Sequence, residues 1–98
     1  MKHHRFLLIA TGAVALLAAC SGRIATASAQ QCSDTLKLAE AELDKAKADG
    51  LGEAVSITKA AGLIVAAATQ KQFEKYEGCL DKAQRARAYI ADAQREKK

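Results

Sequence analysis

Three cysteine thiols, Cys20, Cys32 and Cys79, carry the most specific side-chain chemistry in this sequence of 98 residues. A thiol can be acylated, oxidised to a disulfide, used as a redox centre or bound to a metal. No two of the three stand in the C-x-x-C arrangement that is typical of thiol redox motifs. The two histidines, His3 and His4, both precede the first cysteine. The residues around each cysteine must therefore indicate which chemistry it performs.

Cys20 directly follows the longest apolar run of the chain. Residues 1–5 are basic, and residues 6–19 are apolar with soft interruptions at Thr11 and Gly12. A membrane-spanning helix needs roughly 20 apolar residues, so this run is too short to span. A basic start, a short apolar region and small residues at its end are typical of a secretory signal.

The tetrapeptide Leu17-Ala18-Ala19-Cys20 resembles the bacterial lipobox, where signal peptidase II cuts before a lipidated cysteine. The resemblance implies that residues 1–19 are a lipoprotein signal peptide and that Cys20 carries three acyl chains. Several chains attach a protein far more firmly than one, which holds it only marginally. In enterobacterial lipoproteins, Asp directly after the lipidated cysteine leads to retention in the inner membrane. Ser21 occupies that position here, as in enterobacterial lipoproteins that are delivered to the outer membrane. We therefore expect a lipid-anchored protein on the periplasmic face of the outer membrane.

Two other interpretations of this segment stay open. Ala27-Ser28-Ala29 is an A-x-A site for signal peptidase I, and cleavage there would discard Cys20 and release a soluble protein. That site lies about ten residues beyond the apolar run, with Arg23 between them, which is far for that enzyme. The second interpretation is a retained N-terminal anchor, which the shortness of the apolar run disfavours.

Removal of the signal changes the composition that bears on function. The remaining chain has thirteen Lys and Arg against eleven Asp and Glu, so its formal charge falls from +4 to +2 and gives little support to nucleic-acid binding. Without histidine it lacks the usual nucleophile–base pairs and the usual ligands of zinc, copper or haem. Phe73, Tyr76 and Tyr89 are too few aromatics to enclose a small molecule. We expect no enzymatic activity, cofactor, metal, nucleic acid or small-molecule substrate.

After a flexible tether over residues 20–31, which are small and polar beyond Cys20, the sequence predicts an all-α domain over residues 32–98. This part is Ala-rich, carries mixed charge and lacks proline, which favours helix. A first helix is expected to begin near Ser33 or Asp34, either of which can cap it. Gly50 suits the left-handed position that ends such a helix.

Apolar residues recur at helical spacing in three segments. The second segment, from about residue 53 to about residue 70, is apolar on more than one face, so we expect a middle helix sandwiched between two neighbours. The recurring positions are Leu36, Ala39, Leu43 and Ala46, then Ile57 through Ala68, then Tyr76, Cys79, Leu80, Ala83, Ala86, Ile90 and Ala93.

If Cys20 is acylated, Cys32 and Cys79 remain as a pair in an oxidising compartment, where a disulfide is expected. Cys32 lies roughly 27 Å of helix before the Gly50 turn, and Cys79 would lie roughly 40 Å beyond it on an unbroken second helix. Bridged Cα atoms must lie within about 7 Å of each other, so the chain must reverse again near residues 72–76. The prediction is an up-down-up three-helix bundle stapled at its membrane-proximal end. A redox-active pair and a two-thiolate metal site are the less favoured alternatives.

The spacing of Tyr76, Cys79, Ala83 and Ala86 resembles the second helix of a tetratricopeptide repeat, in which small residues follow an aromatic. The match covers one half-repeat, whereas solenoids need about three units, so it implies similar close packing of helices. Signal, lipobox and helices together resemble the small Ala-rich lipoproteins of Gram-negative envelopes. That resemblance implies an envelope location and no activity.

Three surfaces are candidates for contact with partners. The first is a basic stretch predicted to contact peptidoglycan carboxylates or an acidic protein; the alternative is a solvated face that complements the helix dipole. The second is Lys98, which resembles the terminal lysine of the major trimeric outer-membrane lipoprotein, joined covalently to the cell wall. The third is the Ala-rich helical seam. Alanine side chains bury little area, so we expect that a homo-oligomer or a partner helix covers more of this surface. The basic residues are Arg85, Arg87, Arg95, Lys97 and Lys98.

The sequence thus predicts an outer-membrane lipoprotein with a structural or protein-interaction role in the cell envelope. The alternative is an untethered, secreted helical binding module or inhibitor.

Overall fold

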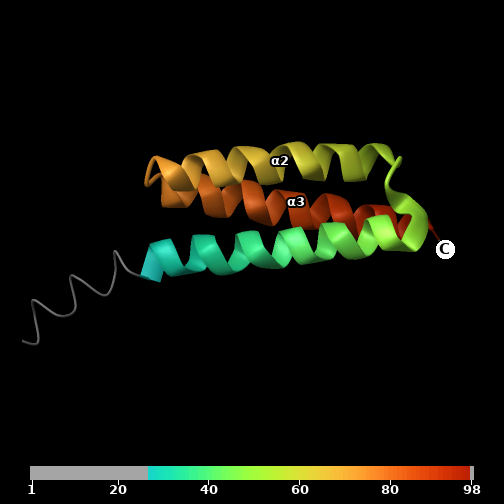
Figure 1. Ribbon diagram of the computed structural model, residues 1–98, viewed down its shortest axis with the longest axis horizontal. Helices are drawn as coiled ribbons and strands as arrows, with labels where there is room; N and C mark the ends of the chain where they lie inside the picture. The colour runs from blue at the N-terminus through green and yellow to red at the C-terminus, as the bar shows by residue number, and fades with distance from the viewer. Residues whose placement is uncertain (1–26, 98) are drawn as a thin grey trace, which may run out of the picture.

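The computed structural model describes residues 27–97, and this part of the chain consists of three helices with no strand (Figure 1). The first helix occupies residues 27–46 and continues into a short π-helical turn, η1 (Lys47–Leu51). It is followed by α2 (Val55–Gln72) and α3 (Tyr76–Glu96). The three long helices lie side by side with their axes nearly aligned (Figure 1). The predicted all-helical bundle is confirmed.

The first helix and α3 run in the same direction, and α2 runs in the opposite one (Figure 1). Contacts at both ends of the bundle show this arrangement. Cys32 and Cys79 are joined near the starts of their two helices, whereas Gln94 contacts Asp49 at the far end. Lys71, at the end of α2, returns to the level of Ser33.

The core of the described domain consists of apolar side chains and the cysteine pair, with no buried polar or charged residue. Each helix presents its buried residues at alternating spacings of three and four, the pattern of a packed helical seam. Half of the buried side chains are alanines, which let the helix axes approach closely but bury little area each. The buried residues are Cys32, Leu36, Ala39, Leu43, Ala46, Ile57, Ala60, Ile64, Ala67, Cys79, Ala83, Ala86, Ile90 and Ala93.

Two turns connect the helices, and each contains one residue with positive φ. Gly50 has φ 88° at the end of η1, the left-handed conformation predicted for it. Glu74 has φ 59° between α2 and α3. The backbone N–H of Glu74 donates to the Lys71 carbonyl at 3.0 Å, and that of Lys75 donates to the Gln70 carbonyl at 2.9 Å. These two bonds form a Schellman motif in which Glu occupies the position usually held by Gly.

The first helix begins earlier than predicted. Residues 27–31 are helical, so the prediction that they belong to a flexible tether is wrong, as is a helix start at Ser33 or Asp34. Ala and Gln, which make up most of this stretch, are good helix formers. The Gln30 amide also donates to the Asp34 carboxylate at 2.8 Å, one helical turn away. The small size of these residues therefore does not make the segment a flexible tether.

The expectation that α2 is sandwiched is also wrong. Only one stripe of α2 is buried (Ile57, Ala60, Ile64 and Ala67), while Val55 and Val65 are 71% and 67% exposed. In a three-helix bundle each helix packs against both neighbours through a single inward face, so no helix lies between the other two. The abundance of alanine made α2 look apolar all round, because alanine occurs equally well on either face.

The predicted signal peptide, the lipidation site Cys20 and Lys98 lie outside the described residues. Within residues 27–97, no helix combines the length and the hydropathy required to cross a membrane.

Candidate functional site

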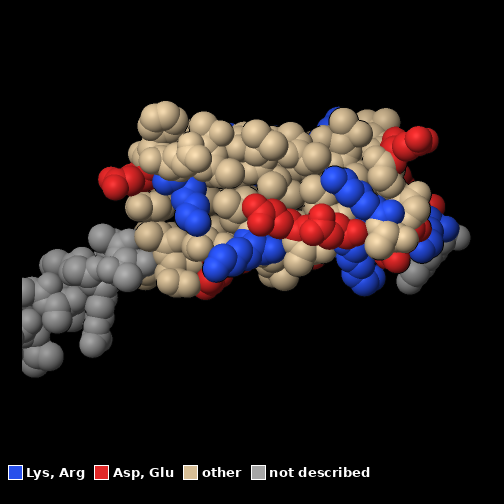
Figure 2. Space-filling model, viewed as in Figure 1, with Lys and Arg blue, Asp and Glu red and all other residues tan. Residues whose placement is uncertain are grey.

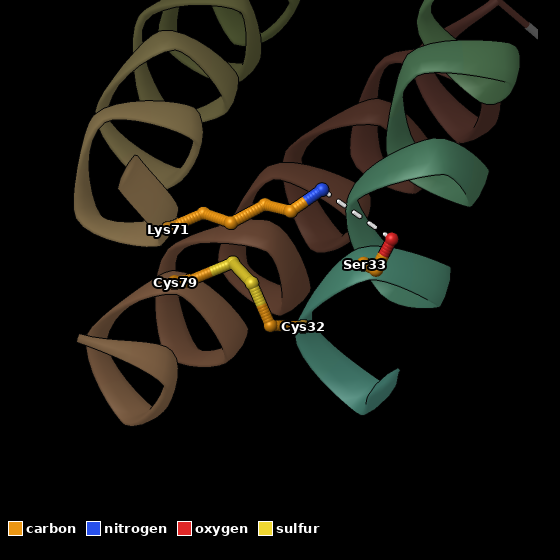
Figure 3. The surroundings of a disulfide bond; sticks show 4 residues. All are labelled: Cys32, Ser33, Lys71 and Cys79. Atoms are coloured by element: carbon orange, nitrogen blue, oxygen red, sulfur yellow. Dashed lines mark hydrogen bonds between the residues drawn. A yellow bond between two sulfur atoms is a disulfide. The ribbon is translucent and has the colours of Figure 1, made fainter. Parts of the chain in front are cut away.

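Cys32 and Cys79 form the predicted disulfide, with their Cα atoms 5.7 Å apart (Figure 3). Both cysteines are completely buried and, with Ile57, are the largest fully buried side chains of the domain. The disulfide is therefore part of the core as well as a covalent link. Thiol–disulfide exchange requires access of a thiolate to sulfur, so a bond buried in this way has a structural role.

The first described residue of the chain lies at the same end of the bundle as the disulfide. Residue 27, where the described helix begins, precedes Cys32 by little more than one helical turn. On the neighbouring surface, the Lys71 ammonium donates to the Ser33 hydroxyl at 3.4 Å (Figure 3). All three helices are thus connected at this end, two by the disulfide and α2 by the lysine.

The structure does not gather the predicted basic residues into one free patch. Arg87 reaches across to Glu42 on the first helix, while Arg85 pairs with Asp81 at 3.8 Å and Arg95 with Asp92 along α3. Basic and acidic side chains alternate on the face shown in Figure 2. Because these three cations have carboxylate neighbours, a contact with cell-wall carboxylates would have to compete with ion pairs inside the domain.

A shallow open groove lies between the first helix and α3 at the end opposite the disulfide. The carboxylate of Asp49 accepts from the Gln94 amide at 3.3 Å and from the Lys45 ammonium at 3.4 Å. The hydrogen bond from Gln94, followed by the positive charge of Lys45, lowers the pKa of Asp49 below its ordinary value. These two contacts favour the ionised form of the Asp49 carboxylate, so the groove carries negative and positive charge side by side. It is lined by Glu42, Lys45, Asp49, Ile90, Ala91, Gln94 and Lys97.

The outer side of α2 is an exposed surface that was not predicted from the sequence. Its exposed positions other than the two lysines are uncharged and follow helical spacing along one side. Both lysines turn sideways, since the ammonium of Lys59 lies 5.5 Å from the centre of the Tyr89 ring of α3 and Lys71 bonds to Ser33. Figure 2 shows a nearly continuous uncharged band along α2. The uncharged positions are Val55, Thr58, Gly62, Val65, Thr69 and Gln72, hereafter the outer stripe.

A signal for this surface was present in the sequence. The charged residues of α2 are Lys59 and Lys71, whereas α3, of similar length, has eight charged residues. A surface helix normally carries charge on its solvent side. The low charge of α2 therefore indicates that its outer side is uncharged, whether that side is buried or exposed.

No cluster of three or more His, Cys, Asp or Glu that could hold a metal occurs within residues 27–97. Comparisons with models of known families, with curated proteins and with solved structures find no match to this chain. The candidate site is therefore a set of surfaces: the disulfide-linked end, the charged groove and the outer stripe.

Proposed function

We propose that this chain is an outer-membrane lipoprotein held by acyl chains on Cys20, with a structural or protein-interaction role in the cell envelope. The observation that carries the proposal is the sequence Leu17-Ala18-Ala19-Cys20 at the end of the apolar run. The disulfide supports it, because it engages Cys32 and Cys79 and leaves Cys20 as the one remaining cysteine of the sequence.

The position of the disulfide fits a tethered domain in an up-down-up arrangement. Between Cys20 and residue 27 the chain can extend at most about 25 Å, at up to about 3.6 Å per residue. The disulfide-linked end would therefore remain near the membrane. The end that contains Gly50 and the Asp49 groove would point away from it. Pulling on the tether would load the first helix at the level where it is covalently bonded to α3.

The first helix also bears on the alternative cleavage site. Cleavage after Ala29 would remove residues 27–29, which belong to the first helix, and would leave Cys32 close to a new N-terminus. Helix ends fray, so the disulfide would then join α3 to the least stable part of the first helix. Cleavage before Cys20 keeps the whole described helix.

Metabolic labelling with radioactive palmitate tests the proposal. The wild-type chain is expected to take up label, and Cys20→Ala is expected to abolish it. Cys32→Ala serves as the matched control, because it removes a cysteine of the disulfide and should leave labelling intact. Wild-type protein that takes up no palmitate and is recovered from the medium would favour the secreted binding module instead.

A further inference from the structure

We infer that the acyl group on Cys20 acts as a protecting group, so that acylation of this thiol precedes the oxidation of Cys32 and Cys79 and directs those two to each other. The inference rests on the proposed function, because it requires a lipid on Cys20, and it gives that lipid a role besides attachment. An exported chain with three free thiols can form three different disulfides. The folded domain contains the Cys32–Cys79 bond.

Loop length favours a different bond in the unfolded chain. Cys20 precedes Cys32 by 12 residues, whereas Cys32 and Cys79 are separated by 47. The probability that the ends of a flexible loop meet falls as the three-halves power of its length, so Cys20 meets Cys32 about eight times as often as Cys79 does. A free Cys20 thiol would therefore bond to Cys32 before Cys79 could.

The direction of export favours the same wrong bond. A secretory signal leads the chain across the membrane from its N-terminus, so Cys20 and Cys32 enter the oxidising compartment before Cys79. During that interval, Cys20 is the only other thiol of the chain that Cys32 can meet.

The structure shows why the wrong bond would damage the domain. Cys32 is completely buried beside Cys79, with the two Cα atoms 5.7 Å apart (Figure 3). A bond from Cys32 to Cys20 would leave the Cys79 thiol unbonded and remove the covalent link between the first helix and α3. Folding protects the native bond only after it has formed, because a thiolate cannot reach sulfur atoms that are completely buried. The wrong bond must therefore be prevented before the domain folds.

Acylation removes the competing thiol without a redox step. The Cys20 sulfur forms a thioether bond to the glyceryl carbon of a phospholipid, the phosphate headgroup leaves that carbon with the bonding electron pair, and the thiol proton passes to the solvent. A thioether has no thiolate that could attack a disulfide. The thiols of Cys32 and Cys79 then lose two electrons and two protons to a disulfide oxidant of the envelope, which is reduced to two thiols.

Oxidation in two settings tests the inference. In concentrated urea, the reduced full chain treated with glutathione disulfide is expected to form the Cys20–Cys32 bond about eight times as often as the Cys32–Cys79 bond. In Gram-negative cells depleted of the enzyme that transfers diacylglycerol to lipoprotein cysteines, newly made chain trapped with N-ethylmaleimide is expected to contain Cys20–Cys32. Undepleted cells are expected to give Cys32–Cys79 alone. Trypsin cuts after Arg23 and Lys37 and so places the three cysteines in separate peptides, which lets non-reducing mass spectrometry identify each bond.

Two variants serve as controls. Cys20→Ala in depleted cells is expected to restore the Cys32–Cys79 bond, which excludes a general effect of depletion on oxidation. Ser21→Cys in undepleted cells leaves Cys20 acylated and adds a free thiol beside it, so this chain is expected to bond residue 21 to Cys32.

The outcomes separate this inference from the proposed function. Native pairing alone in depleted cells or in Ser21→Cys overturns the inference, as do a ratio in urea near one and a Cys20→Ala chain without the native bond in depleted cells. Each of these results leaves the proposed function intact as long as Cys20 is acylated in undepleted cells. A wild-type chain that pairs Cys32 with Cys79 in undepleted cells while Cys20 carries no lipid overturns both.

Discussion

Cys32 and Cys79 are joined across parallel helices with a sequence separation of 47 residues, and the buried residues of those helices keep that same separation along their whole length. Leu36 and Ala83 follow the cysteines, and the last pair is Ala46 and Ala93. The disulfide is thus the first level of a regular seam. Because seven of the fourteen buried side chains in the described domain are alanines, this bond is expected to supply much of the stability.

The first prediction concerns the disulfide. Replacing Cys32 and Cys79 together by alanine is expected to lower the free energy of unfolding by about 4 kcal/mol, the chain-entropy value for a loop of this length. Urea unfolding followed by circular dichroism measures the change. Leu38→Ala, at a side chain that is 45% exposed, is a control and should cost far less. A double variant with an unchanged unfolding midpoint would mean that the bond is incidental to the fold.

The second prediction uses two glycines that differ only in backbone conformation. Gly50→Ala is expected to destabilise the domain by about 1 kcal/mol or more, because an L side chain is strained at φ 88°. Gly62→Ala is expected to stabilise it by about 0.5–1 kcal/mol, because that position is helical and the new Cβ meets open space. Thermal unfolding compares the two variants with the wild type. Changes of the same sign would contradict the geometry of the Gly50 turn.

The third prediction concerns Glu74, which holds a left-handed conformation at φ 59°. A residue other than Gly or Asn in this region costs of order 1–3 kcal/mol. Glu74→Gly is therefore expected to stabilise the domain despite the added freedom of the unfolded chain, and β-branched Glu74→Val to destabilise it. The measurement is the denaturant midpoint of each variant. A midpoint for Glu74→Gly below that of the wild type would argue against the Schellman turn between α2 and α3.

The fourth prediction is a pH dependence. The pKa of Asp49 is lowered in the folded domain, chiefly by the hydrogen bond from Gln94 and then by Lys45. A lowered folded pKa contributes stability above the unfolded value near 3.8, and that stability is lost as the pH falls through the folded pKa. Asp49→Asn should therefore be less stable than the wild type at neutral pH, with a difference that disappears in acid. Asp44→Asn, at an exposed position of the same helix, is the control. A difference between Asp49→Asn and the wild type that does not depend on pH would exclude this linkage.

The sequence was informative wherever residue size and spacing determined the packing. The seam residues of the first helix and α3 were predicted individually, because apolar residues at three- and four-residue spacing define one face, while charged residues occupy most of the other positions. The break between α2 and α3 lies at residues 73–75, where neither glycine nor proline marks it. It was predicted only because Cys32 and Cys79 fix how far apart the helix starts can lie.

Other features could not be predicted from periodicity alone. In α2, half-buried alanines and the exposed Val65 extend the apolar pattern beyond the buried stripe, so its exposed side was indistinguishable from its buried one. The pairing of Arg87 with Glu42 depends on how two helices 45 residues apart are aligned, which local patterns do not specify. The helical conformation of residues 27–31 depends on propensity in a stretch without apolar spacing.

The most direct test of this account is the intact mass of the protein purified from a Gram-negative membrane under non-reducing conditions, with fragmentation from the N-terminus. The account predicts a first residue at Cys20 that carries a diacylglycerol and an amide-linked acyl chain, together with the loss of two hydrogens that a closed Cys32–Cys79 bond produces. A mature protein that begins at Gln30, or that begins at Cys20 without any lipid mass, would contradict it.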